Sequence, residues 1–281
     1  MTEAPRHDSG VVALNHDARE TYDRALRQAR EAAFARDEFV GQESFMPASD
    51  ILRLAEHAGI TAHSTVLDVC CGVGGPGLLL ARRFGCRYHG IDASAAAVRI
   101  ARARAGDLDC RFDVHKVPPL PIGRYDIVVL LETLLAFENK DGLLRAAYDA
   151  LPAGGRFAFT VEVGRSLSAA ERNLMPEPDT VWPVPMVELL SQLDSVGFQV
   201  TWQEDCSATH AAMARRLYDE FVADADDIVQ QIGRTAHDSL LTSHRLWADW
   251  LETGRVRKLA VVAAKVPELR PNQPAGPTVV S

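Results

Sequence analysis

Residues 66–77 (VLDVCCGVGGPG) carry side-chain types suited to binding a nucleotide-like ligand. An acid, Asp68, precedes two glycines, Gly72 and Gly74. Glycines let the backbone approach a ligand, and the free N–H groups at the start of a following helix point toward it. A second acid, Asp92, lies 24 residues further on (92 − 68 = 24), near the spacing of about 20 at which a carboxylate binds ribose hydroxyls. Together these residues predict a site for a nucleoside-containing cofactor.

The surrounding pattern predicts the elements that hold these residues. A buried strand precedes the glycines and an apolar helix follows them, so the motif lies at a strand-to-helix turn. From residue 65 strands and helices alternate, which is typical of a doubly wound, Rossmann-like α/β sheet. The predicted strands are 65–70, 87–91, 110–114, 125–131, 156–162, 198–204 and 256–264. The predicted helices are 18–37, 50–58, 75–84, 94–105, 141–150 and 186–196.

Two segments interrupt the alternation. Residues 164–185 contain four prolines and predict a long loop over a pocket. Residues 207–254 have a helical pattern between the last two strands and predict an inserted lid. We therefore expect a mobile tail and helix over 1–40, the main domain over 41–265, and a disordered tail over 266–281.

Composition limits the partners. The 281 residues have a formal net charge of −8, which argues against nucleic acid or an anionic membrane surface as the main partner. The one small basic cluster, Arg255, Arg257 and Lys258, reads as a solvated strand end. The five cysteines form no C-x-x-C pair and no spacing typical of a metal site, so we expect no metal and reduced thiols in the cytoplasm. No apolar run reaches the roughly 18 residues that span a bilayer.

Four ordered segments, VLDVCCGVGGPG, GIDAS, YDIVVLLETLLAF and LPAGGRFAFT, resemble the class I S-adenosylmethionine-dependent methyltransferases. The resemblance covers about residues 40 to 265 and is closer to small-molecule methyltransferases with a helical lid. It implies a seven-stranded sheet of six parallel strands and one antiparallel strand. It also implies S-adenosylmethionine as cofactor, S-adenosylhomocysteine as product and a small molecule as partner.

The resemblance assigns roles to individual residues. Asp68 would organise the glycine loop and the amino group of the methionine moiety, and Gly72 and Gly74 would let the backbone approach the sulfonium. Asp92 would bind both ribose hydroxyls, with Ala93 against the adenine. Further cofactor contacts are expected from Gln42, Val117 (through its backbone N–H) and Leu131, and Ser44 lies in the same closing segment as Gln42.

Three departures from the family pattern bear on mechanism. Cys70 stands where the family usually has the first glycine of its loop, and we expect it still to lie on the strand. The usual adenine-contacting Asp is missing, since Lys116 and Val117 occupy its place. The His that often serves as base after the fourth strand is also missing. Leu135 and Ala136 stand there instead, which predicts an apolar pocket better suited to a carbon or amine nucleophile than to an alcohol.

The candidate catalytic residues each have a structural alternative. Glu132 could bind the methionine moiety or stabilise positive charge, or it could cap a helix. His210 could act as a base from the lid, and Tyr22 could close over the cofactor; for each residue a purely structural role is the alternative. We expect Trp182, Glu162 and His244 at the substrate pocket, and either Glu162 or Glu171 could be a base or a metal ligand for a diphosphate substrate.

The sequence thus predicts a methyltransferase for a small, largely apolar metabolite, with C- or N-methylation ahead of O-methylation. Specialised natural-product metabolism is the setting that the resemblance favours. An NAD(P)-dependent oxidoreductase is an alternative, but it would want G-x-G-x-x-G, which Cys70 interrupts. A non-catalytic nucleoside-binding module also remains open. The N-terminal helix could contact a second subunit, so a homo-oligomer is possible.

Overall fold

The computed structural model describes residues 16–266, so most of the two predicted tails lies outside the described part. One mixed sheet of seven strands has the order β3-β2-β1-β4-β5-β7-β6. β7 runs antiparallel to both of its neighbours, whereas the other pairs are parallel. The strands are β1 (Thr65–Val69), β2 (Arg87–Asp92), β3 (Cys110–Val114), β4 (Ile127–Leu130), β5 (Arg156–Val163), β6 (Phe198–Asp205) and β7 (Arg257–Lys265). The predicted fold class is confirmed.

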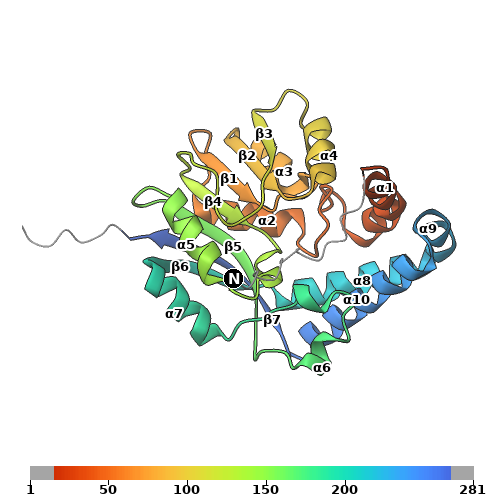
Figure 1. Ribbon diagram of the computed structural model, residues 1–281. Coiled ribbons are helices and arrows are strands. Elements are labelled where there is room, and N and C mark those ends of the chain that lie inside the picture. The colour runs from red at the N-terminus through yellow and green to blue at the C-terminus, as the bar shows by residue number, and fades with distance from the viewer. Residues whose placement is uncertain (1–15, 267–281) are drawn as a thin grey trace, which may run out of the picture.

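Helices cover both faces of the sheet (Figure 1). One apolar core joins the sheet to α2 (Ala48–Ala58), α3 (Gly75–Phe84) and α4 (Ala95–Ala105). The other joins it to α5 (Asp141–Ala150) and α7 (Met186–Val196). The strands in the middle are therefore buried on both faces, which explains their continuous apolar sequence.

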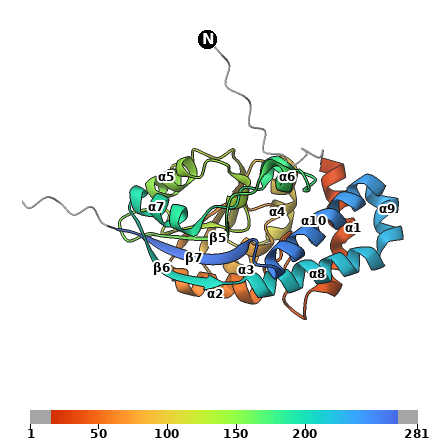
Figure 2. The same cartoon turned by 90° about the horizontal axis from the view of Figure 1, so that it is seen from below.

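The insertion between β6 and β7 is helical, as predicted, and consists of α8 (Ser207–Ala223), α9 (Ala225–Ile232) and α10 (Arg234–Glu252). The N-terminal helix α1 (His16–Ala33) packs against α8 and α9, beyond one side of the sheet (Figures 1 and 2). These helices share a core of their own, in which Leu26, Phe221 and Ile228 are almost completely buried. The lid and α1 thus form a second packed unit beside the sheet.

The remaining differences from the sequence prediction are local. Each predicted strand overlaps an observed strand to within two residues at either end. The first helix ends at Ala33 instead of residue 37. Beyond its end, Phe34 packs in the core shared with the lid, and Asp37 has a left-handed φ of 67°. Residues 164–185 are largely irregular, as predicted, and contain only α6 (Ala169–Arg172) and the short helix η2 (Pro178–Thr180). No helix within residues 16–266 is long and apolar enough to cross a bilayer.

Candidate functional site

The glycine loop leaves β1 through a left-handed turn. Cys70 lies just beyond the strand with a φ of 61°, so the expectation that it still belongs to the strand is wrong. Gly72 and Gly74 also have positive φ values, of 53° and 83°. A Cβ on Gly74 would lie 3.0 Å from the Ala101 Cβ and 3.1 Å from the Phe112 ring, so this turn fits only glycine closely.

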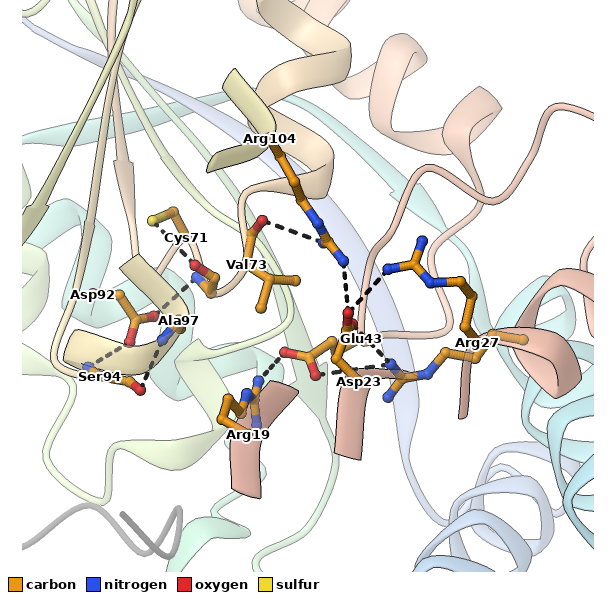
Figure 3. Close-up of polar contacts among 12 residues, drawn as sticks. Arg19, Asp23, Arg27, Glu43, Cys71, Val73, Asp92, Ser94, Ala97 and Arg104 are labelled. Carbon is orange, nitrogen blue, oxygen red and sulfur yellow. Dashed lines mark hydrogen bonds and ion pairs between the residues drawn. The ribbon is translucent and has the colours of Figure 1, made fainter. Parts of the chain in front are cut away.

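The second predicted acid stabilises this loop. One carboxylate oxygen of Asp92 accepts the Gly72 N–H at 2.9 Å, and the other accepts the Ser94 N–H at 2.8 Å (Figure 3). Ser94 in turn caps α4 by accepting the Ala97 N–H. Asp92 therefore joins the turns after β1 and β2, and Ala93 lies exposed beside it. The structure brings the two halves of the predicted cofactor motif together.

Asp68 lies beneath this loop and is only 3% exposed. It accepts a hydrogen bond from the Tyr88 hydroxyl. Burial raises the pKa of Asp68 to about 7, although the Tyr88 hydrogen bond opposes the shift. The Tyr88 ring occupies the space that a Cβ on Gly77 would fill, since that Cβ would lie 2.0 Å from the ring. Gly77 therefore makes room for the partner of Asp68.

The other expected cofactor residues have different surroundings. The Gln42 side chain holds its own loop: its oxygen accepts the Val40 N–H, and its nitrogen donates to two backbone carbonyls. Its polar atoms are therefore committed to the fold. Val117 lies in the turn after β3 and packs on the core that contains α5. Leu131 directly follows β4 and packs on the opposite core.

Charged side chains tie α1 to the glycine loop (Figure 3). Arg104 donates to Asp23 of α1 at 2.7 Å and to the Val73 carbonyl of the loop at 3.4 Å. Arg19 of α1 pairs with Glu43, whose carboxylate lies 3.7 Å from where a Cβ on Gly72 would be. The N-terminal helix thus packs beside the loop instead of extending away from the domain.

Tyr22, the third catalytic candidate, lies on this helix. It is partly buried against the core shared with the lid. Burial raises the pKa of its hydroxyl, although nearby Arg30 opposes the shift. Tyr22 does not line the cavity described next.

A cavity of about 220 Å³ adjoins the glycine loop beneath the lid. It includes two predicted catalytic residues, Glu132 and His210, and two predicted pocket residues, Glu162 and His244. Glu43 lines this cavity and also stands over Gly72, so the cavity and the loop are neighbours. The other lining residues are Ser44, Phe45, Leu135, Ser243, Trp247, Leu251 and Lys258.

Buried charges form one side of this cavity. Glu132 follows β4 with a left-handed φ of 60°, and its N–H donates to the Thr160 hydroxyl at 2.6 Å. The Lys258 ammonium lies 2.8 Å from the Glu132 carboxylate and also donates to Glu162. His210 is 1% exposed, and its Nε2 lies 3.4 Å from the same Glu132 carboxylate. Four side chains from different elements therefore meet at the cavity.

The electrostatics of this group follow from its pairing. Burial alone would raise the pKa of Glu132, but Lys258 and His210 outweigh it and hold the pKa far below its usual value. Burial alone would lower the pKa of Lys258, but Glu132 and Glu162 hold it above its usual value. The cavity thus has two carboxylates beside one ammonium. On its other side, burial lowers the pKa of His244 to about 4.

Two predictions are corrected here. Lys258, expected at a solvated strand end, is 2% exposed. The pocket expected to be apolar has apolar walls, including Phe45 and Leu135, but a charged side. The sequence could have indicated Lys258, because a continuous apolar run follows it and such a strand is buried on both faces.

Two further candidates lie outside the cavity lining. The Trp182 ring packs under the Arg172 guanidinium at 4.1 Å, and its N–H donates to the Asp179 carbonyl. Glu171 caps α6 together with Ser168. Its hydrogen bond with Arg255 lowers its pKa to about 2. Both residues organise the loop between β5 and α7.

The described residues also bear on metals and thiols. Between residues 16 and 266 no group of three or more His, Cys, Asp or Glu side chains is arranged to hold a metal ion. All five cysteines are free. Burial raises the pKa of Cys206 to about 12, and it also raises those of Cys70 and Cys71, so these thiols are poor nucleophiles.

Known proteins share this fold and parts of this sequence. Ajmaline N-methyltransferase from Rauvolfia serpentina is 30% identical over 122 residues, 41% of this chain and 42% of that protein. Sterol 24-C-methyltransferase from Eremothecium gossypii is 32% identical over 111 residues, 37% of this chain and 30% of that protein. The matched part is thus less than half of either relative.

A solved structure of phosphoethanolamine N-methyltransferase 2 from Haemonchus contortus contains phosphomonomethylethanolamine and S-adenosylhomocysteine. It superposes with a TM-score of 0.72 at 18% identity, covering 92% of this chain and 61% of that one. A family model described as a methyltransferase domain matches residues 15–203, which is more than half of the chain. The chain therefore belongs to the methyltransferase-domain family. Its seven-stranded sheet, with β7 antiparallel, is that of the class I, S-adenosylmethionine-dependent methyltransferases.

Proposed function

We propose that this protein transfers a methyl group from S-adenosylmethionine to the nitrogen of a small amine with an apolar body. The observation that carries the proposal is the buried group of Glu132, Glu162 and Lys258 at an apolar-walled cavity next to the glycine loop. Two carboxylates of this group line the cavity. Carboxylate oxygens stabilise the positive charge that develops on an amine nitrogen as it is methylated.

The glycine loop fits the cofactor. Asp92 would hold the ribose hydroxyls, and Gly72 leaves the space above the loop free of a side chain of its own. When bound, the cofactor supplies a methyl group activated by a positively charged sulfur. The task of the protein is then to orient the amine and to exclude water. The lid, with Trp247 and Leu251, supplies the walls that do so.

The titratable groups favour nitrogen over oxygen as acceptor. An alcohol must lose its proton to become a good nucleophile, which requires a strong general base. Glu132 is a weak base, because Lys258 and His210 hold its pKa low. His244, with a pKa of about 4, is also weak. An amine already has a free electron pair when it arrives unprotonated, and Glu132 can accept an N–H hydrogen bond that aligns it.

The size of the cavity, about 220 Å³, suits a compact amine. Its walls of Phe45, Leu135 and Trp247 suit an apolar body. We assign the activity to specialised natural-product metabolism in the cytoplasm on the family resemblance alone. A homo-oligomer would use the exposed face of α1, because the other face packs on the lid of its own chain.

A matched acceptor panel tests the proposal. The protein is incubated with S-adenosylmethionine carrying a deuterated methyl group and with amines, alcohols and alkenes of the same carbon skeletons. Products are read by mass spectrometry. We expect label in amines, loss of turnover in Glu132→Gln, and normal turnover in the exposed control Glu138→Gln. Label in alcohols or alkenes alone would contradict the choice of nitrogen, and failure to bind the cofactor would overturn the methyltransferase assignment.

A further inference from the structure

We propose that Lys258 is a positioning residue, which keeps Glu132 ionised and pointed at the acceptor cavity; this inference rests on the proposed function. Lys258 lines the cavity together with Glu132 and Glu162, and its ammonium is paired with both carboxylates. We therefore infer that Lys258 affects the acceptor by holding these two carboxylates in place.

The topology of the sheet brings Lys258 to the site. The parallel strands β4 and β5 end at the edge that carries the glycine loop, and ligands of such sheets bind at that edge. β7 is antiparallel, so it begins where they end. Lys258 is the second residue of β7 and pairs in register with Glu162 of β5. A parallel strand in the same place would carry its second residue at the opposite edge.

The pairing of Lys258 is reciprocal. A buried ammonium is unfavourable unless carboxylates compensate it, and Lys258 is 2% exposed. Its partners are Glu132 and Glu162, which are themselves mostly buried and like-charged. Two carboxylates at one site disfavour each other's ionisation, and the ammonium between them removes that penalty.

Glu132 needs this support because its backbone is strained. A non-glycine residue with a φ of 60° is uncommon, and such strain persists only where the surroundings hold it. The Thr160 hydroxyl fixes its backbone N–H, and Lys258 fixes its carboxylate. With Lys258 removed, the longer 3.4 Å contact with His210 is the one side-chain contact within residues 16–266 that still orients the carboxylate.

We therefore expect that removal of Lys258 makes the ionisation of Glu132, and with it the turnover number, depend on pH near neutrality. Without the ammonium, burial raises the pKa of Glu132, and the two carboxylates share a proton as a pair. The other titratable groups around the pair are His210 and Cys206 at the start of α8, Lys140 before α5, Asp50 of α2, and Glu43 and His244 at the cavity. These groups stay in every variant below, so a new titration reports the loss of Lys258.

The kinetic test compares Lys258→Met, Lys258→Arg and Arg257→Met. Arg257 precedes Lys258 on β7 but is exposed and pairs with Asp205, so its variant is the matched control. For Lys258→Met we expect kcat at pH 7 to fall on the order of 100-fold. We expect it to recover partly as pH rises and the carboxylate pair loses its proton. Lys258→Arg keeps the charge and should lack this pH dependence, and S-adenosylhomocysteine affinity should stay unchanged in all three.

An infrared measurement separates this inference from the proposed function. A protonated buried carboxyl group gives a C=O band that a carboxylate lacks. Asp68 contributes such a band near neutral pH in every variant, because burial raises its pKa to about 7, so each spectrum is compared with that of the wild type. We expect an additional band in Lys258→Met and no additional band in Lys258→Arg, whether or not any amine is methylated. If Lys258→Met fails to fold, Lys258→Met/Glu162→Gln, which removes one charge of each sign, replaces it and should show the same band for Glu132. An unchanged pH profile together with no new band would overturn the proposal.

Discussion

Replacement of Gly77 by alanine should destabilise the protein, although alanine is the better helix former. Gly77 is the third residue of α3, where alanine would contribute about 1 kcal/mol of helix propensity. The new Cβ, however, would lie 2.0 Å from both Cζ and the hydroxyl oxygen of Tyr88. Overpacking of this kind costs about 1–3 kcal/mol. Displacement of the ring also removes the buried hydrogen bond to Asp68, worth about 1–3 kcal/mol. The net loss is about 3 kcal/mol.

The matched control is Gly142→Ala in α5. There a Cβ would meet only Pro118, at an ordinary 3.7 Å, so the substitution should be neutral or stabilising. Urea unfolding followed by tryptophan fluorescence gives both free energies of unfolding. Equal stability of the two variants would refute the placement of the Tyr88 ring against α3. Gly77→Ala/Tyr88→Phe should not restore stability, because phenylalanine keeps the Cζ atom that would lie 2.0 Å from the new Cβ and lacks the hydroxyl that donates to Asp68.

Two further predictions concern side chains at the edges of the site. Because His244 has a folded pKa of about 4 against 6.5 in the unfolded chain, the unfolded state binds more protons between these values, and stability falls as pH drops through them. Relative to His244→Phe, the wild-type unfolding free energy should fall by about 2 kcal/mol from pH 7 to pH 5, and parallel urea curves would contradict this. Glu171→Gln should leave kcat within about threefold of wild type, because Glu171 caps α6 and binds Arg255 away from the cavity. A loss on the order of 100-fold would make it part of the chemistry.

The sequence predicted the frame of the fold because its signals are local. Residues 65–69 and 127–130 are short, largely apolar runs, and the glycine loop that follows residue 69 has a fixed spacing from Asp92. The helical pattern of residues 207–254 likewise depends on neighbours in sequence. Because these signals depend only on residues close together in the sequence, the sheet, the lid and the cofactor-binding edge of the sheet could all be predicted.

The charged side of the cavity could not be predicted in the same way. It joins Glu132, Glu162, His210 and Lys258, which lie on four elements far apart in sequence. Their meeting depends on the antiparallel course of β7 and on the angle of α8 over the sheet. Trp182 illustrates the same difficulty, since only the fold shows that its ring packs against Arg172.

A calorimetric titration with S-adenosylhomocysteine most directly tests whether the glycine loop and Asp92 bind the cofactor. We expect saturable binding by the wild type and by the exposed-acid control Asp107→Asn. For Asp92→Asn we expect an affinity about 10- to 100-fold lower, because a hydrogen bond to a charged group contributes about 1.5–3 kcal/mol. NADH should give no heat of binding. Binding of NADH instead of S-adenosylhomocysteine, or equal affinity in both variants, would contradict the account.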